Sequence, residues 1–205
     1  MVANYRMATG WSRFPVAYEV GGKVRWFDLC QAGKSVVTRR GAGLLVTCTA
    51  IDPEGGVWTL RQSYQPTTRP GGIALSVTLG VNAPRTVYFA AMLAVFPGLG
   101  SFGAKRERGL FAGLEYLDPK DVSSSEADLR GEQARRLVPD HVKITFPLMV
   151  MQARGRYIGI IWEPRPWLAA AYDTPDRSFG SGPNAMALIV PGSDRSNRSE
   201  GRLLP

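Results

Sequence analysis

The feature that most constrains the fold of this chain is a period-two alternation of apolar and polar residues, interrupted by glycine- and proline-rich turns. Val16–Val20 and Lys23–Leu29 alternate on either side of Gly21-Gly22. Two short strands joined by a glycine pair predict a β-hairpin. The same pattern continues in Gly43–Ile51 and in Val57–Tyr64. Strands at near-regular spacing, separated by turns, indicate an antiparallel sandwich or barrel.

The alternation continues toward the C-terminus, after a loop expected over Gln65–Gly72. Pro147 would interrupt a central ladder, so we expect a bulge or an edge at that point of its strand. The remaining expected strands are Ile73–Val81, Arg85–Phe96, Val142–Gln152, Tyr157–Trp162 and Ala185–Val190. These patterns predict an all-β fold, an antiparallel β-sandwich with long irregular loops, of which a large super-sandwich is one form.

Arg85–Phe96 is the most apolar of these segments, and a buried helix competes there with a buried strand. Its β-branched and aromatic beginning favours the strand, as do Pro84 and Pro97 at its two ends. A strand covered on both faces is expected to lose its alternation in this way.

The chain is long enough for one large all-β domain, and no linker divides it before its last residues. We therefore predict a single domain over residues 1–191. Residues 192–205 (GSDRSNRSEGRLLP) have the composition of a disordered tail. No signal peptide is visible, and the best membrane candidate, Val87–Phe96, is about half the length of a spanning helix. A cytoplasmic location without a membrane partner is the default prediction.

The formal net charge of +8 points to an anionic partner, but the arginines are scattered along the sequence. No basic helix or stripe is present, so we predict no specific nucleic-acid partner. Cys30, Cys48 and His141 are the only cysteines and the only histidine, which excludes a self-contained zinc site of the usual composition. Two buried thiols are expected rather than a disulfide, although the fold could bring them together. No cofactor is predicted.

A glycine-rich stretch, Phe96–Ser125, breaks the strand pattern and resembles the irregular backbone that often carries a site. Within it, Glu115 stands among apolar neighbours in the segment GLEYL. Burial among such neighbours disfavours the ionised carboxylate and suits a general acid. The alternative is an outward-facing strand residue that pairs with Arg106 or Arg108.

A second carboxylate and several aromatic residues complete the candidate site. Glu163 ends an apolar strand and could form a glycosidase-like catalytic pair with Glu115 if both faced one cleft. Indole faces cover the apolar side of a sugar ring, and carboxylates accept hydrogen bonds from its hydroxyl groups. The candidate ligand-binding residues are Glu115, Tyr116, Trp162, Trp167 and Asp173.

The order of several short motifs resembles the β-sandwich region of large, poorly characterised bacterial proteins that are organised like multidomain carbohydrate-active enzymes. These motifs are Gly100–Gly103, Gly113–Leu117, Ser123–Ser125, Lys143–Met149 and Gly159–Trp162. The resemblance implies a glycoside-hydrolase-like context beside a helical domain of a longer parent protein. No such helical region follows here up to Pro205, so we expect an isolated module or a fragment.

The leading hypothesis is therefore a carbohydrate-related module, either glycan-binding or accessory. One alternative is a carbohydrate-active enzyme that uses Glu115 with a second carboxylate such as Glu163. The other is a structural protein-interaction module, because β-sandwiches host unrelated functions.

Overall fold

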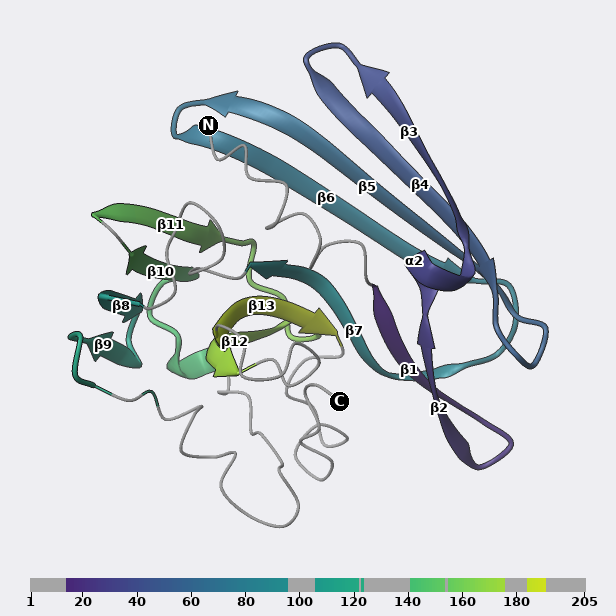
Figure 1. The fold of residues 1–205 in the computed structure, drawn as a ribbon. Coiled ribbons are helices and arrows are strands. Elements are labelled where there is room, and N and C mark those ends of the chain that lie inside the picture. Colours follow the sequence, from purple (N-terminus) through teal and green to yellow (C-terminus); the bar gives the residue numbers. More distant parts are fainter. Residues whose placement is uncertain are drawn as a thin grey trace. The chain divides into compact units, whose positions relative to one another are not determined.

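The structure is a computed structural model that describes residues 14–95, 106–121, 123, 141–153, 155–175 and 184–190. It confirms the predicted all-β, antiparallel architecture, in which strands predominate and the sheets do not close into a barrel (Figure 1). The backbone contacts divide the chain into two compact units. The meander unit is Ser12–Val87, and the sandwich unit is Met1–Trp11 together with Tyr88–Pro205. Compact units also occur inside single domains, so the prediction of one domain stays a prediction.

The meander unit begins with the predicted hairpin. β1 (Pro15–Val20) pairs with β2 (Lys23–Asp28) around Gly21 and Gly22, and both glycines have a positive φ. The short helix α2 (Leu29–Ala32) follows directly. The Asp28 carboxylate caps it by accepting hydrogen bonds from the backbone N–H groups of residues 30 and 31.

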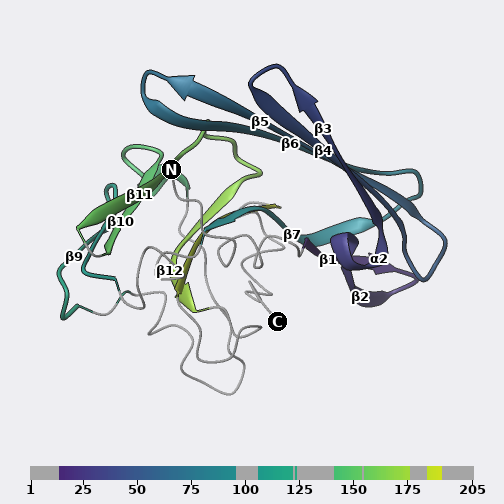
Figure 2. The same ribbon diagram turned by 45° about the horizontal axis from the view of Figure 1, so that its top comes forward.

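Four consecutive strands then form an antiparallel meander, with each strand beside its neighbour in the sequence (Figures 1 and 2). The strands are β3 (Lys34–Arg40), β4 (Gly43–Ile51), β5 (Val57–Thr68) and β6 (Gly71–Val81). β5 and β6 are longer than expected, because pairing continues through Pro66 opposite Ile73 and through Thr68 opposite Gly71. The prediction of a loop over residues 65–72 is therefore wrong, and only a tight turn remains.

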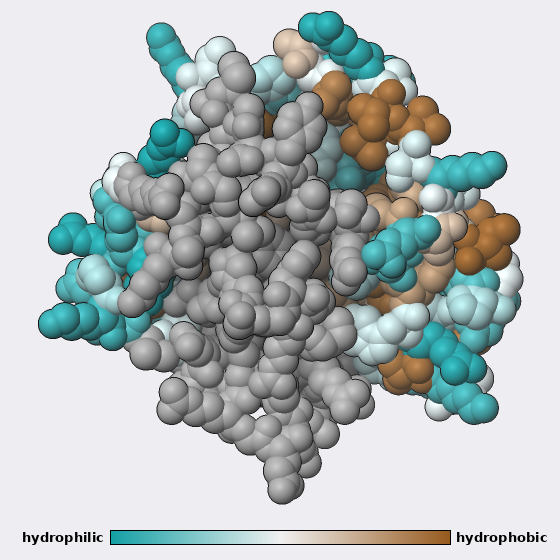
Figure 3. All heavy atoms as spheres, viewed as in Figure 1, coloured by the Kyte–Doolittle hydropathy of each residue, from teal (hydrophilic) through white to brown (hydrophobic). Residues whose placement is uncertain are grey.

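One end of this sheet carries the core of the meander unit. On the apolar face, Cys48, Leu60 and Trp58 are fully buried, and the Trp58 ring lies 5.5 Å from that of Tyr18. The other end of the sheet keeps apolar side chains at the surface. Figure 3 shows hydrophobic residues over β3 and β4, where Val36, Val37 and Leu44 are exposed.

The two cysteines are free thiols, as expected, but the expectation that both are buried holds for Cys48 alone, because Cys30 is half-buried. Cys48 is buried and its Sγ donates to the Leu29 carbonyl oxygen at 3.4 Å. Burial, followed by the nearby Cys48 and Asp28, raises the pKa of Cys30 to about 12. Cys30 is therefore protonated at neutral pH, and Cys48 serves as a small core residue.

The described part of the sandwich unit contains two antiparallel sheets. In one, β13 (Asn184–Val190) lies between β12 (Ala169–Pro175) and β7 (Thr86–Val95). The strand interpretation of this segment is thus confirmed over Thr86–Val95, and the helix alternative is wrong. In the other sheet the order is β11-β10-β8-β9. Its strands are β8 (Arg108–Phe111), β9 (Glu115–Leu117), β10 (Leu148–Ala153) and β11 (Arg156–Ile161).

The two sheets of the sandwich unit share one apolar core. Met149 and Met151 of β10 pack with Tyr172 of β12 and Met186 of β13. Strand β10 begins only after Pro147, and a short 3₁₀ turn, η2 (His141–Lys143), lies before it. The expected strand over residues 142–147 is therefore wrong, because proline cannot donate to the ladder and here ends it.

Within the described residues, none of the helices has the length and apolarity that a membrane crossing requires. The predicted disordered tail, 192–205, lies outside the described residues, as do residues 96–105, 122, 124 and 125 of the glycine-rich stretch.

Candidate functional site

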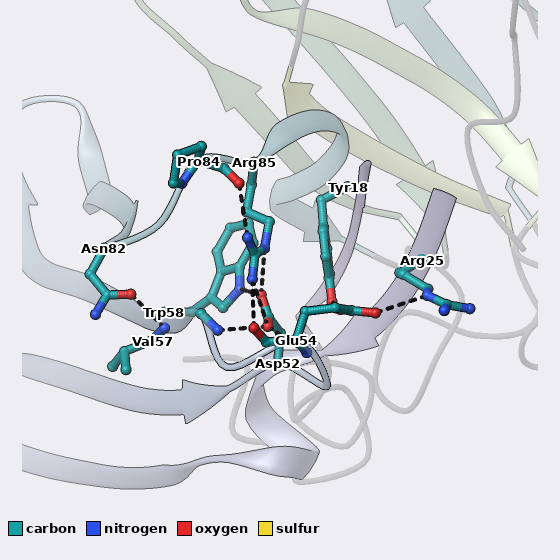
Figure 4. A network of polar contacts seen from close by, with 10 residues as sticks. Tyr18, Arg25, Asp52, Glu54, Val57, Trp58, Asn82, Pro84 and Arg85 are labelled. Atoms are coloured by element: carbon teal, nitrogen blue, oxygen red, sulfur yellow. Dashed lines mark hydrogen bonds and ion pairs between the residues drawn. The ribbon is translucent and has the colours of Figure 1, made fainter. Parts of the chain in front are cut away.

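The most highly connected polar group in the described structure is Asp52, in the turn between β4 and β5 (Figure 4). Its side chain is fully buried and faces the Arg85 guanidinium, with Nε 2.9 Å from Oδ2 and Nη2 3.0 Å from Oδ1. The Trp58 indole N–H donates to Oδ2 at 2.8 Å. The backbone N–H groups of Glu54 and Gly56 donate to Oδ1. These five hydrogen bonds occupy the acceptor sites of the carboxylate.

A second layer surrounds this pair in the same unit. The Tyr18 hydroxyl donates to Glu54 Oε2 at 2.6 Å, and Arg25 Nε lies 3.0 Å from Glu54 Oε1. The Arg85 guanidinium carbon lies 5.5 Å from the centre of the Tyr18 ring. Figure 4 shows these side chains converging from β1, β2 and the β4–β5 turn.

The ionisation of the cluster follows from its hydrogen bonds. Burial raises the pKa of Asp52, but the hydrogen bonds from Arg85, Trp58 and Gly56 outweigh it and lower the pKa to about 2. Burial and the hydrogen bond to Glu54 raise the pKa of Tyr18. Asp52 is therefore charged and Tyr18 is neutral at neutral pH.

A carboxylate with all its acceptor sites filled is poorly suited to take a proton from a ligand. We therefore interpret the cluster of Asp52, Arg85 and Trp58 as a structural one that stabilises the β4–β5 turn. The proline and glycines of residues 52–56 are typical of a turn, but the partner Arg85 is 33 residues away in the chain. No local pattern could have identified it.

The predicted site residues lie in the sandwich unit, and the alternation along β9 separates two of them. Glu115 is half-buried and pairs with Phe111, a core residue, so it faces the inner side of the sheet. Tyr116 points to the opposite side and is 72% exposed. The Gly113 backbone N–H donates to its hydroxyl oxygen at 3.4 Å. Glu115 and Tyr116 therefore face opposite sides of the sheet and cannot contact the same ligand from one surface.

The other predicted residues follow β11. Trp162 is half-buried, and its ring lies 6.4 Å from that of Phe111, so it belongs to the margin of the core. Glu163 is exposed and forms an ion pair with Arg165. Trp167 is exposed in the connection to β12. Asp173 lies within β12, and its side chain is outside the described part of the structure.

A surface that the sequence did not single out lies on the outer side of the β11-β10-β8-β9 sheet. Met149 and Met151 face the core, so the alternate residues of β10 and their cross-strand partners face outward. Two tyrosines mark its ends: Tyr116 on one edge strand, and Tyr157, 67% exposed, on the other. We call this surface the tyrosine face. Its residues are Arg108, Leu110, Tyr116, Leu148, Val150, Gln152, Tyr157, Gly159 and Ile161.

The tyrosine face combines groups that can contact a flat amphipathic ligand. Three strand spacings, about 14 Å, separate the two edge strands, and the tyrosines are also offset by two residues along the strand direction. Between them, Leu110 and Val150 are apolar, whereas Gln152 and Arg108 can hydrogen-bond. Gly159 has no side chain to obstruct approach at the middle of the β11 edge. Such a surface can bind a ligand, but it contains no pair of groups arranged for proton transfer.

Among the described residues, no three histidine, cysteine, aspartate or glutamate side chains gather as a metal site would require. Comparisons with protein-family models, with curated proteins and with solved structures find no match to this chain.

Proposed function

We propose that this chain is a glycan-binding module and that the tyrosine face is its ligand-contacting surface. The observation that carries the proposal is the exposure of Tyr116 and Tyr157 on one side of one sheet. A tyrosine ring covers the apolar face of a sugar, while its hydroxyl group and nearby polar side chains bind the sugar's hydroxyl groups. A rigid sheet holds both rings without further ordering on binding, which reduces the entropic cost of association.

The alternative of a glycoside hydrolase has less support. A catalytic carboxylate pair requires two carboxyl groups that face one cleft. Glu163 is exposed and paired with Arg165, whereas Glu115 faces the inner side of its sheet beside Phe111. We therefore assign neither residue a catalytic role in the proposal.

The test is isothermal titration calorimetry of the full chain against a panel of neutral and acidic oligosaccharides. For any sugar that binds, we expect Tyr116→Ala and Tyr157→Ala each to weaken binding by about 1 kcal/mol, or roughly fivefold, the scale of an aromatic contact. The control is Trp26→Ala, because Trp26 is an exposed aromatic residue of the meander unit and should leave binding unchanged.

Two results would decide against the proposal. Absence of binding across the panel would remove the glycan function. Binding that is insensitive to both tyrosine variants but weakened by Trp167→Ala would move the site to the connection between β11 and β12.

A further inference from the structure

The β6 strand at the edge of the meander carries unused backbone hydrogen-bonding groups. Within the described residues, β6 (Gly71–Val81) pairs with β5 on one side only (Figures 1 and 2). Its eleven residues pair with β5 without a register shift, and none is charged or a proline. A long, regular edge strand without such residues is a template for pairing with another strand.

The opposite edge of the same sheet is protected by charge. β3 is exposed at all seven residues and carries Lys34, Arg39 and Arg40. Lysine and arginine on an edge discourage pairing, because a second strand would remove water from these charged groups, and a second copy would also bring like charges together. Both edges belong to one sheet. The difference in charge between them therefore comes from the residues of β3 and β6 themselves.

The sequence of β6 also reads nearly the same in both directions about Val77. Leu75 and Leu79 are identical, and Ser76 and Thr78 both carry hydroxyl groups. Farther out, Ala74 and Gly80 are both small, and Ile73 and Val81 are both β-branched. In an antiparallel pair centred on Val77, each residue would therefore meet its own kind.

We propose that β6 pairs antiparallel with β6 of a second copy of this chain, about a two-fold axis at Val77. A two-fold interface uses the same surface from both partners, so a strand with this symmetry suits it. The pairing keeps Leu75, Val77 and Leu79 on the apolar face and leaves the exposed residues Ser76 and Thr78 on the polar face. Two four-stranded sheets then become one continuous sheet.

The charge of the chain does not oppose this arrangement. The nearest cationic strand residue is Arg61 of β5, which pairs with Thr78. Three strand spacings would separate the two Arg61 residues in the joined sheet, about 14 Å, and the Debye length at physiological salt is about 8 Å. Their repulsion is therefore largely screened. This inference concerns a different surface from the tyrosine face and stands independently of the glycan function.

The experiment is sedimentation analysis of the full chain over a concentration series. We expect the wild type to form a dimer, and Ser76→Lys with Thr78→Lys to raise the dissociation constant at least about tenfold, because lysines would stand directly opposite each other in both copies. The matched control is Thr49→Lys with Thr59→Lys. It adds the same charges to exposed positions of the same face on β4 and β5, and it should leave the dimer intact.

A charge-exchange experiment tests the register. In the arrangement centred on Val77, residue 76 of one copy faces residue 78 of the other. A variant with Ser76→Glu and Thr78→Glu should therefore form a mixed dimer with the lysine variant, with circular dichroism confirming that each variant keeps its strand spectrum. A wild type that is monomeric at every concentration, a dimer that survives the lysine pair, or the absence of a mixed dimer would overturn the proposal.

Discussion

The interiors of the two units differ in kind. In the meander unit a single buried carboxylate, Asp52, receives five hydrogen bonds and pairs with the nearly buried Arg85. In the sandwich unit the core is apolar and rich in methionine, with Met149, Met151 and Met186 fully buried. We therefore expect the stability of the first unit to depend strongly on one polar group and that of the second unit to be spread over many apolar contacts.

The largest expected effect is the loss of the buried ion pair. Asp52→Ala leaves the Arg85 guanidinium buried without its carboxylate, which should cost about 3–5 kcal/mol of unfolding free energy. The matched control is Asp118→Ala, which breaks the exposed pair of Arg108 and Asp118 and should cost less than about 1 kcal/mol. Urea denaturation measures both. Equal losses of unfolding free energy in the two variants would show that the buried ion pair of Asp52 contributes no more to stability than an exposed one.

The next effect concerns a polar contact in the sandwich core. The Tyr172 hydroxyl donates to the Val150 carbonyl oxygen at 3.1 Å. The same hydroxyl lies against Gly109, where an added Cβ would be 1.9 Å from the hydroxyl oxygen. Gly109→Ala should therefore destabilise the protein by about 1–3 kcal/mol through overpacking.

The double variant provides the check. Tyr172→Phe removes the oxygen that the added methyl group would meet, so Gly109→Ala should cost less in its presence than in the wild type. Simple additivity of the two losses in urea denaturation would contradict the proposed clash.

A third effect is a specific acid sensitivity of the meander unit. The pKa of Asp52 is lowered to about 2 in the folded state, whereas an unfolded aspartate has a pKa of about 3.9. Its stabilisation is therefore fully present above about pH 4 and is lost as the pH falls through about 2. The difference between the two pKa values corresponds to a loss of roughly 2–3 kcal/mol. Asp52→Asn should remove this part of the pH dependence from denaturation curves, and an unchanged acid limb would contradict the assignment.

The smallest effect tests the tolerance of the sandwich core. Met151→Leu conserves the volume of a fully buried side chain, so it should cost less than about 1.5 kcal/mol. The same measurement of unfolding free energy applies. A loss as large as that of Asp52→Ala would mean that the two interiors are equally sensitive to substitution.

Much of the fold was predictable because alternation and turn residues act locally. The hairpin about Gly21 and Gly22 and the strand that became β7 were both predicted within a few residues of their observed bounds. The extent of β5 was not, because Pro66 and the following residues resemble a loop by composition. Their strand conformation depends on pairing with β6, which the local sequence does not express.

The site was less predictable than the fold. Alternation in the segment GLEYL does imply that Glu115 and Tyr116 face opposite sides, but it does not indicate which side faces the core. That choice depends on the pairing of Glu115 with the buried Phe111. Tyr157 and Tyr116 lie on the same surface because β10 and β8 stand between their strands in one sheet. This arrangement joins distant segments of the chain, so the local sequence does not reveal it.

The order of the strands also has a kinetic consequence. In the meander every strand from β3 to β6 pairs with its neighbour in sequence, so each pairing closes a short loop. In the sandwich unit Val95 pairs with Met186, and Met149 with Phe111. Long loops cost more entropy before their contacts form, so local topologies fold faster. We expect pulsed hydrogen exchange during refolding to show protection of the β4 and β5 amides before those of β7 and β13. By the same reasoning, a chain emerging from the ribosome would form the meander sheet while its remaining strands still lack partners.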